Sequence, residues 1–335
     1  MRFNRMFTTV DTHTGGEPTR TITGGIPYIQ GKTVSEKMLY LQEKEDWIRQ
    51  TLMLEPRGND VMSGVILTEP CTPGADLGVI FTEVGGYLPM CGHDTIGVCT
   101  ALIETGIIKP VEPFTFITLD TPAGIVKVKV KVDDNVAKEV TFRNIPSFVF
   151  AKDIEVVVPS LGKFVVDIAY GGNYYAIVQA ADFNLQVKPA ETQKIIQTAK
   201  LIKEAINEQI KVFHPEKDFI NEVTHVEFSA PPTHPEAHLK NAVVIPDGSI
   251  DRSPCGTGSS AKLATLYAKG KLKINEEFVH ESIIGSIFKC RVVEETTVGE
   301  FNAVITEITG NAFVTGMHTF VIDPEDPLLH GFKLG

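Results

Sequence analysis

The chain has 335 residues, of which 43% are hydrophobic and 22% are charged, and its formal net charge is −11. This length predicts about two domains, each with a substantial core. No apolar run reaches the roughly 18 residues of a membrane-spanning helix, and Met1 to Val10 lack the continuous apolar stretch of a secretory signal. The acidic balance repels a phosphate backbone. We therefore expect a cytoplasmic protein with no membrane or nucleic-acid partner.

The first predicted helix covers residues 33–54, because Thr33 and Glu36 form a capping box and apolar residues recur after them at helical spacing. A second long amphipathic helix is predicted near 191–210. Strands are predicted, in chain order, at residues 61–68, 77–82, 125–132, 138–143 and 164–179. Strands and helices do not alternate one for one, which favours mixed sheets over a doubly wound parallel sheet.

Two cysteine segments look like copies of one unit. Cys91-Gly92 opens a segment that ends at Gly106, and Cys255-Gly256 opens one that ends at Gly270, so both intervals are fifteen residues. Each segment predicts a helix of about three to four turns that begins at the cysteine and is capped by the glycine. Orphan amides and the helix dipole favour a thiolate there, so we expect lowered thiol pKa values. The same amides can hold a carboxylate.

Two matched thiols suit the inversion of a carbon stereocentre. Inversion through a planar carbanion needs a base on one face and an acid on the other, and Cys91 with Cys255 would supply both. Substrate carboxylate and developing charge would be held by amides at the two helix starts, those of Gly92, His93, Gly256 and Thr257. The alternative, that both cysteines are ordinary buried hydrophobes, does not explain their matched contexts.

Other candidate sites are weaker. His234 and His238 flank Glu236 at a spacing that could bind metal on a helix, but the neighbouring prolines predict a surface loop. Cys99 is expected in the core, and no sequence pattern gives Cys71 or Cys290 a catalytic or metal-binding partner.

Two other functional classes remain open. One is a redox enzyme, although no Cys-x-x-Cys spacing is present. The other is a non-catalytic amino-acid binding protein.

Five runs, spread over nearly the whole chain, resemble motifs of the proline racemase family. They are Asp11-Thr12-His13-Thr14-Gly15-Gly16-Glu17, Glu55-Pro56-Arg57-Gly58, Met90-Cys91-Gly92-His93, Tyr170-Gly171-Gly172-Asn173 and Asp251-Arg252-Ser253-Pro254-Cys255-Gly256-Thr257-Gly258. The family includes proline racemase, 4-hydroxyproline 2-epimerase and trans-3-hydroxyproline dehydratase, which lack pyridoxal phosphate and metal. The resemblance therefore implies a racemase or epimerase with no cofactor and no metal.

The resemblance also implies an α/β fold like that of diaminopimelate epimerase. This fold has two similar domains, each a mixed sheet wrapped around a central helix, with the active site in the cleft between them. Residues 1–124 and 312–335 would form the domain that carries Cys91, and residues 125–311 the domain that carries Cys255. Family members are commonly homodimers, so we expect a homodimer that binds a small-molecule substrate.

Carried over by resemblance, Cys91 and Cys255 match the catalytic pair, and His93 and Asp251 match residues near the substrate nitrogen. The dehydratases typically have threonine at the second cysteine position, so Cys255 favours inversion over elimination. Asp94 departs from the glycine or asparagine that often follows the family's histidine, and the sequence does not show what this changes.

Substrate preference depends on two positions beside the motifs. Where proline racemases have phenylalanine, this chain has Ser63, one residue before Gly64, and Ile245, ten residues before the second cysteine. These residues leave more room, and the Ser63 hydroxyl could bond a ring hydroxyl. The overall match favours racemisation of free proline, and the alternative is 4-hydroxyproline 2-epimerase by the same mechanism.

Overall fold

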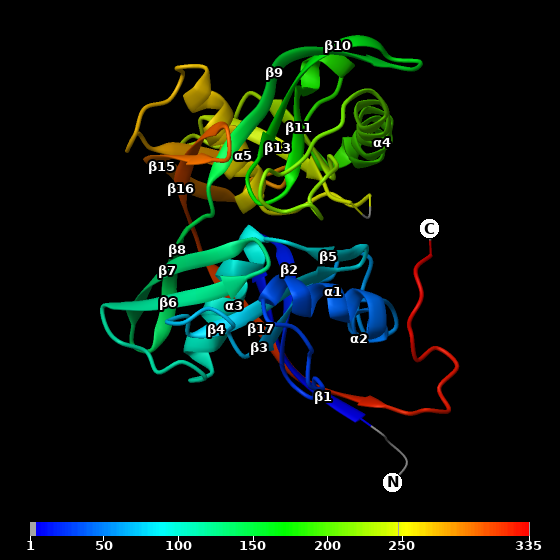
Figure 1. The fold of residues 1–335 in the computed structure, drawn as a ribbon, viewed down its shortest axis with the longest axis vertical. Helices are drawn as coiled ribbons and strands as arrows, with labels where there is room; N and C mark the ends of the chain where they lie inside the picture. Colours follow the sequence, from blue (N-terminus) through cyan, green and yellow to red (C-terminus); the bar gives the residue numbers. More distant parts are fainter. Residues whose placement is uncertain (1–4, 247, 335) are drawn as a thin grey trace. The chain divides into compact units, whose positions relative to one another are not determined.

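The computed structural model describes residues 5–246 and 248–334 and divides the chain into two compact units (Figure 1). Unit 1 runs to Phe142 and resumes at Gly310, and unit 2 spans Arg143–Thr309. Of the N-terminal stretch interpreted above, residues 1–4 lie outside the described part of the chain.

Unit 1 contains β1 (Arg5–Thr14), β2 (Glu17–Gly24), α1 (Val34–Lys44), α2 (Trp47–Met53), β3 (Ser63–Thr68), β4 (Leu77–Glu83), β5 (Gly86–Leu88), α3 (Gly92–Glu104), β6 (Phe114–Thr121), β7 (Gly124–Asp133), most of β8 (Val136–Arg143) and β17 (Ala312–Ile322). Its sheet is mixed. β1 pairs antiparallel with β17 and β2, β2 pairs parallel with β3, and β3 pairs antiparallel with β4. β4 also pairs antiparallel with β5 and parallel with β6, and β6 forms an antiparallel hairpin with β7.

Unit 2 contains β9 (Ser147–Val158), β10 (Gly162–Tyr170), β11 (Tyr174–Gln179), the 3-10 helices η1 (Ala180–Phe183) and η2 (Pro189–Glu191), α4 (Thr192–Gln209), β12 (His225–Ala230), β13 (Leu239–Val244), α5 (Gly256–Ala268), β14 (Phe278–Glu281), β15 (Ile287–Val298) and β16 (Phe301–Gly310). Successive strands pair from β9 to β16, and β16 pairs with β9, so this sheet closes into a barrel. The pairs β11–β12 and β13–β14 are parallel, and the other pairs are antiparallel.

The two units repeat one topology. In unit 1 the parallel pairs are β2–β3 and β4–β6, separated by the antiparallel pair β3–β4. In unit 2 the parallel pairs β11–β12 and β13–β14 flank the antiparallel pair β12–β13 in the same way. α3 lies in sequence between β4 and β6, and α5 between β13 and β14. The cysteine helices therefore occupy equivalent positions.

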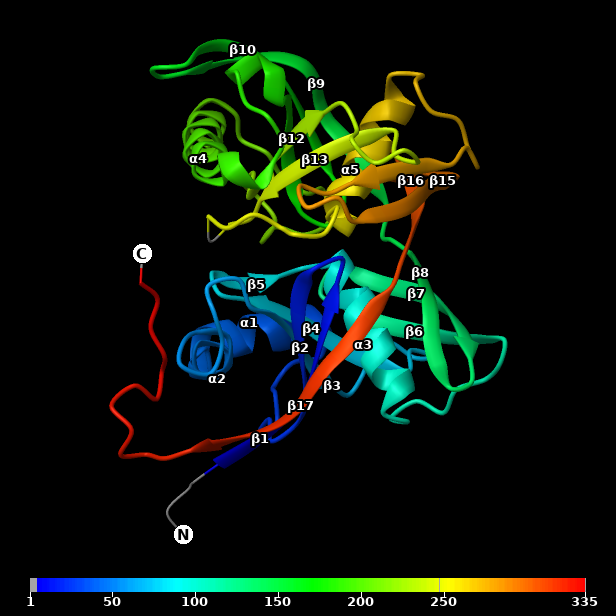
Figure 2. The ribbon, with the colours of Figure 1, turned by 180° about the vertical axis from the view of Figure 1, so that it is seen from behind.

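Each cysteine helix is the central helix of its unit, with strands around it (Figures 1 and 2). Residues 92–103 of α3 and 256–265 of α5 are buried, as expected of helices enclosed on all sides. Small residues allow this close packing: a Cβ added to Gly171 would lie 2.2 Å from the carbonyl oxygen of Thr257. The predicted α/β fold, with two similar mixed sheets wrapped around central helices, is confirmed.

Most predicted elements are present, with two differences in their limits. The helix predicted at 33–54 is two helices, because α1 ends at Lys44 and Asp46 begins α2, its carboxylate bonded to Arg49 and Gln50. Thr33 caps α1 as predicted. In a capping box the Glu36 carboxylate would accept a hydrogen bond from the amide of Thr33. Here it accepts one from the amide of Lys32, the preceding residue. The strand predicted at 164–179 is two strands, β10 and β11, joined by a turn.

The division into units differs from the one predicted at residue 124. The alternating strand at 125–132 is part of β7, which pairs with β6 from Thr121↔Gly124 to Phe114↔Lys131 and so stays in unit 1. The first boundary falls after Phe142, and the second falls between Thr309 and Gly310, close to the predicted start at 312.

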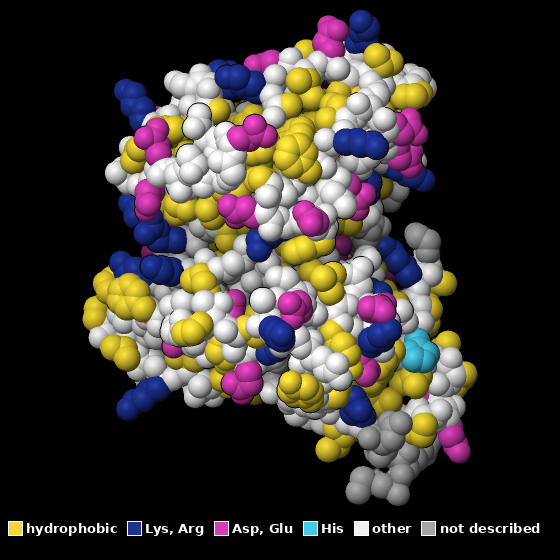
Figure 3. All heavy atoms as spheres, viewed as in Figure 1, with side chains coloured by type: hydrophobic (Ala, Val, Ile, Leu, Met, Phe, Trp, Pro, Cys, Tyr) yellow, Lys and Arg dark blue, Asp and Glu magenta, His cyan; other side chains and the backbone are white. Residues whose placement is uncertain are grey.

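The predictions for His234, His238 and Cys99 are confirmed. His234 and His238 lie in a loop, as the prolines indicate, and Cys99 is fully buried. On the face shown in Figure 3, Lys and Arg side chains are interspersed with Asp and Glu side chains. Within the described residues, none of the helices has the length and apolar character needed to cross a bilayer.

Candidate active site

Cys91 is the residue that precedes α3, as the sequence predicts, and it is 6% exposed. Its carbonyl accepts hydrogen bonds from the amide and the hydroxyl of Thr95, which hold the first turn. At the other end, Gly106 has a φ of +72° and donates to the Ile103 carbonyl, so the predicted C-terminal glycine is confirmed. The amides at the start of such a helix have no partner within the helix and can hold an anion.

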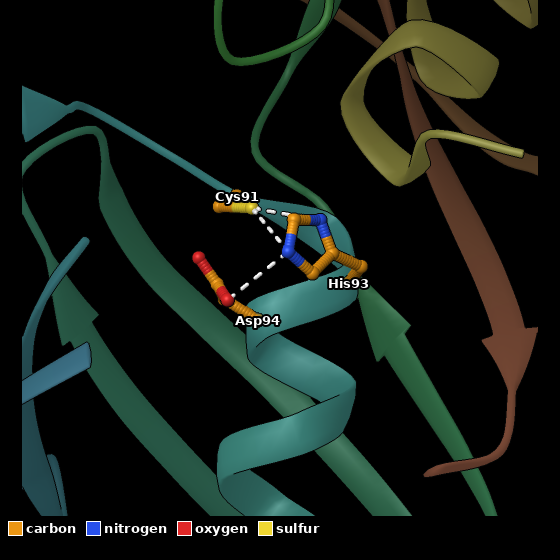
Figure 4. Close-up of side chains that lie close together, drawn as sticks. All are labelled: Cys91, His93 and Asp94. Atoms are coloured by element: carbon orange, nitrogen blue, oxygen red, sulfur yellow. Dashed lines mark hydrogen bonds and ion pairs between the residues drawn. The ribbon is translucent and has the colours of Figure 1, made fainter. Parts of the chain in front are cut away.

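Three side chains form a polar cluster at this helix start (Figure 4). Cys91 Sγ lies 3.3 Å from Nδ1 of His93, and Nε2 of His93 lies 3.1 Å from an oxygen of Asp94. Figure 4 shows the His93 ring turned toward both the sulfur and the carboxylate. Cys91 and His93, each predicted separately as a site residue, are therefore in contact, and Asp94 is the third member of the cluster.

The pKa of Cys91 is shifted in the opposite direction to the prediction. Burial raises it to about 12, and the Asp94 charge adds to the rise, while His93 and the Asp94 amide oppose it. Burial lowers the pKa of His93, but the Cys91 and Asp94 charges outweigh burial and hold it well above its usual value. Burial thus opposes ionisation of the Cys91 thiol, and the Asp94 carboxylate favours the protonated form of His93. The sequence-based expectation of a lowered pKa considers the helix start and omits burial.

The role of Asp94 becomes clear from its contacts. It is fully buried, and its carboxylate accepts hydrogen bonds from the hydroxyls of Thr19, at 2.7 Å, and Ser63, at 2.6 Å. Asp94 thus links Ser63, a predicted substrate-binding residue, to His93 and Cys91. Thr19 and the bridging function of Asp94 are not evident from sequence, because they depend on the packing of α3 against β2 and β3.

The same cluster has a donor set that a metal could use. Cys91, His93 and Asp94 each offer one ligand atom, and these atoms lie within 4.8 Å of one another. Thiolate, imidazole and carboxylate are the donors of zinc sites. Binding would require deprotonation of the Cys91 thiol and of His93, both disfavoured by the raised pKa values. The absence of metal from the reaction stays a prediction.

Cys255 precedes α5 in the same way and is 5% exposed, but its backbone differs from that of Cys91. Its φ is +62°, against −138° for Cys91, a conformation that costs a non-glycine residue about 1–3 kcal/mol. Hydrogen bonds hold it there: the Cys255 amide donates to the Ser253 hydroxyl, and the Pro254 carbonyl accepts from Asn241 and Ser259. These hydrogen bonds therefore hold the Cys255 backbone in its positive-φ conformation.

The Cys255 thiol lies beside the hydroxyl groups of Tyr175 and Thr257. The Tyr175 hydroxyl lies 3.3 Å from Cys255 Sγ and 2.6 Å from the Thr257 hydroxyl. Burial, followed by the charge of Cys255, raises the pKa of Tyr175 well above its usual value, so the phenol stays protonated. Sequence reasoning missed Tyr175. The available signal was its position two residues after the Tyr170–Asn173 motif.

The remaining predicted residues of unit 2 lie around Cys255. Gly256 and Thr257 form the first turn of α5. Asp251 is buried, accepts a hydrogen bond from the Ser253 amide, and lies close enough to contribute to the raised pKa of Tyr175. Ile245 packs against the hydrophobic cluster that contains Cys255 and Tyr175. In unit 1, Gly92 and His93 form the first turn of α3 beside Cys91.

Comparison with known proteins agrees with the fold. A family model described as proline racemase matches residues 9–333. Proline racemase from Clostridioides difficile is 50% identical over 334 residues, which cover 100% of both chains. The 4-hydroxyproline 2-epimerase from Streptosporangium roseum is 48% identical over 334 residues, again with 100% of both chains covered.

Among solved structures, a hydroxyproline epimerase from Agrobacterium vitis with bound trans-4-hydroxy-L-proline superposes with a TM-score of 0.94 at 37% identity, covering 100% of this chain and 97% of that chain. The fold and these relatives define an isomerase of the amino-acid racemase and epimerase class. The chain belongs to the proline racemase family.

Proposed function

We propose that this protein inverts the Cα of free proline by a two-base mechanism in which Cys91 and Cys255 transfer the protons. The observation that carries this proposal is the equivalent position of the two cysteines, each preceding a buried central helix in one of two units of the same topology. A cysteine at the start of a buried helix places a proton-transferring sulfur beside backbone amides that suit a carboxylate.

In the proposed reaction, the thiolate of one cysteine removes the Cα proton and becomes a thiol. The thiol of the other cysteine donates its proton to the opposite face of Cα and becomes a thiolate, so protons and charge balance. The raised pKa of Cys91 suits the thiol member of the pair. The amides of residues 92, 93, 256 and 257 would hold the carboxylate and the charge that develops on it. Asp251, a buried carboxylate, would face the substrate ammonium.

The substrate could instead be 4-hydroxyproline, and Ser63 is the residue that bears on this choice. Its hydroxyl donates its proton to Asp94, so toward a ligand it can only accept a hydrogen bond. A ring hydroxyl could donate to it, whereas proline offers no such group. Relatives named proline racemase and 4-hydroxyproline 2-epimerase are almost equally similar, at 50% and 48% identity.

A chiral chromatography assay of the purified protein tests the proposal. L-proline, D-proline and the 4-hydroxyproline isomers are supplied separately, with no added cofactor. We expect each proline enantiomer to be converted to an equal mixture of both. Inversion of 4-hydroxyproline alone would replace proline with the alternative substrate, and inversion of neither would contradict the assignment of a racemase acting on these imino acids.

We also propose, from the family resemblance, that the protein is a cytoplasmic homodimer that binds only a small molecule. Light scattering after size-exclusion chromatography tests the oligomeric state. A mass equal to one 335-residue chain would contradict the dimer.

A further inference from the structure

The repeated topology allows residues of the two units to be matched position by position. The parallel ladder between β2 and β3 begins at Thr19↔Ser63, and the equivalent ladder between β11 and β12 begins at Tyr175↔His225. Thr19 therefore corresponds to Tyr175. Within the helices, Asp94 lies three residues after Cys91 and corresponds to Gly258, three residues after Cys255.

At these two matched positions, the central helix of unit 1 carries a side chain where that of unit 2 has glycine, and the strand of unit 2 carries the larger side chain. In unit 1 the strand residue is the small Thr19, and the helix supplies the Asp94 side chain, which bonds it. In unit 2 the helix supplies Gly258, and a Cβ there would lie 3.1 Å from a ring carbon of Tyr175 and 3.1 Å from Cys255 Sγ. The Tyr175 ring thus fills the space that a side chain at 258 would need.

The exchange gives each cysteine a different polar neighbour. Cys91 contacts His93, which is paired with the Asp94 carboxylate. Cys255 contacts the Tyr175 hydroxyl, which also bonds the Thr257 hydroxyl. Tyr175 is fully buried, and its ring lies 4.7 Å from the His225 ring, so the phenol oxygen is fixed in place.

The three groups can form a directed chain of hydrogen bonds. When Cys255 is a thiolate, the Thr257 hydroxyl can donate to Tyr175 and the Tyr175 hydroxyl can donate to the sulfur. When Cys255 is a thiol, its proton can be donated to Tyr175, which then donates to Thr257. We propose that this chain stabilises and orients the Cys255 thiolate, which makes Tyr175 a positioning residue for this cysteine. The catalytic importance of this chain of hydrogen bonds rests on the function proposed above.

The test measures the ionisation of Cys255 directly and needs no substrate. The protein is labelled with ¹³C at the cysteine Cβ, and the five cysteine signals are assigned with single Cys→Ser variants and followed against pH. A hydrogen bond to a charged acceptor corresponds to a pKa difference of about one to two units. In Tyr175→Phe we expect the titration midpoint of Cys255 to rise by this amount and that of Cys91 to stay unchanged.

Tyr174→Phe is the matched control, because it also removes one buried tyrosine hydroxyl. That hydroxyl donates to the Phe213 carbonyl and not to a thiol. The Cys255 midpoint should therefore be the same in Tyr174→Phe and in the wild type. An unshifted Cys255 midpoint in Tyr175→Phe, or an equal shift in both variants, would overturn the proposal.

A second pair of variants tests the chain at its other end and decides the matter if Tyr175→Phe does not fold. Thr257→Val should raise the Cys255 midpoint by a smaller amount, and Thr257→Ser, which keeps the hydroxyl, should restore it. Equal Cys255 titration midpoints in these two variants would contradict the proposed chain of hydrogen bonds. Because the titration is independent of turnover, a protein inactive on proline and 4-hydroxyproline that still shows these shifts would refute the proposed function and leave the thiolate contact in place.

Discussion

Replacing Asp94 by asparagine tests the polar cluster at the start of α3. The carboxylate accepts hydrogen bonds from Thr19 and Ser63 and pairs with His93 in a fully buried position. Asparagine has nearly the same shape but keeps only one acceptor oxygen, and its amide group would face a hydroxyl or imidazole donor. The variant loses one charge-assisted bond and leaves a buried donor unsatisfied, so we expect a loss of about 2–4 kcal/mol in unfolding free energy.

The loss should also depend on pH, because Asp94 helps to raise the pKa of His93. A histidine whose pKa is higher in the folded state stabilises the protein fully below its unfolded pKa of about 6.5, and this contribution disappears as pH rises through the folded value. The wild type has more of this contribution than Asp94→Asn. The stability difference between them should therefore be largest below about pH 6.5 and should narrow at higher pH.

Urea unfolding of both proteins at several pH values from about 5.5 to about 8.5 measures this difference. Asp120→Asn is the matched control, since Asp120 is also a buried carboxylate but accepts from the Cys71 and Thr72 amides. Its stability loss should not vary over the same range. A loss in Asp94→Asn that is constant with pH, or that grows as pH rises, would refute the role assigned to the His93–Asp94 pair.

Two further predictions concern catalysis. Cys91→Ser and Cys255→Ser should each abolish racemisation, measured by chiral chromatography, because a hydroxyl ionises far less readily than a thiol. The thermal unfolding transition should stay intact in both variants. Near-normal activity in either variant would contradict the two-base assignment. Ser63→Phe should lower any 4-hydroxyproline activity about tenfold more than proline activity. Ser63→Ala, which removes the hydroxyl without adding bulk, should show the same selectivity, and an equal loss on both substrates would count against Ser63 as a specificity residue.

Local patterns in the sequence are sufficient to predict the two central helices. A cysteine followed by small residues and a glycine fifteen positions later marks the limits of each helix, and both limits are present in the structure. The alternating strand at 125–132 is equally clear, but alternation does not show which sheet a strand joins. Its pairing with β6 is a contact within unit 1, which moves the boundary between the units to Phe142.

The environment of the thiols is less accessible to sequence reasoning. The raised pKa of Cys91 comes mainly from burial, which depends on the strands around α3. Tyr175 contacts a cysteine 80 residues further along the chain, and this contact exists because Gly258 leaves room for its ring. Asp94 stands out from the sequence as a departure from the family pattern, and only its bonds to Thr19 and Ser63 show what it does.

The central claim is that two different groups, one on each face of Cα, transfer the protons. The most direct measurement is the isotope content of both enantiomers during the first turnovers of L-proline in deuterated water. The two-base account predicts that the D-proline formed carries deuterium at Cα, while the remaining L-proline is still unlabelled. D-proline that retains the original proton would show that a single group removes and returns it, and would contradict the account.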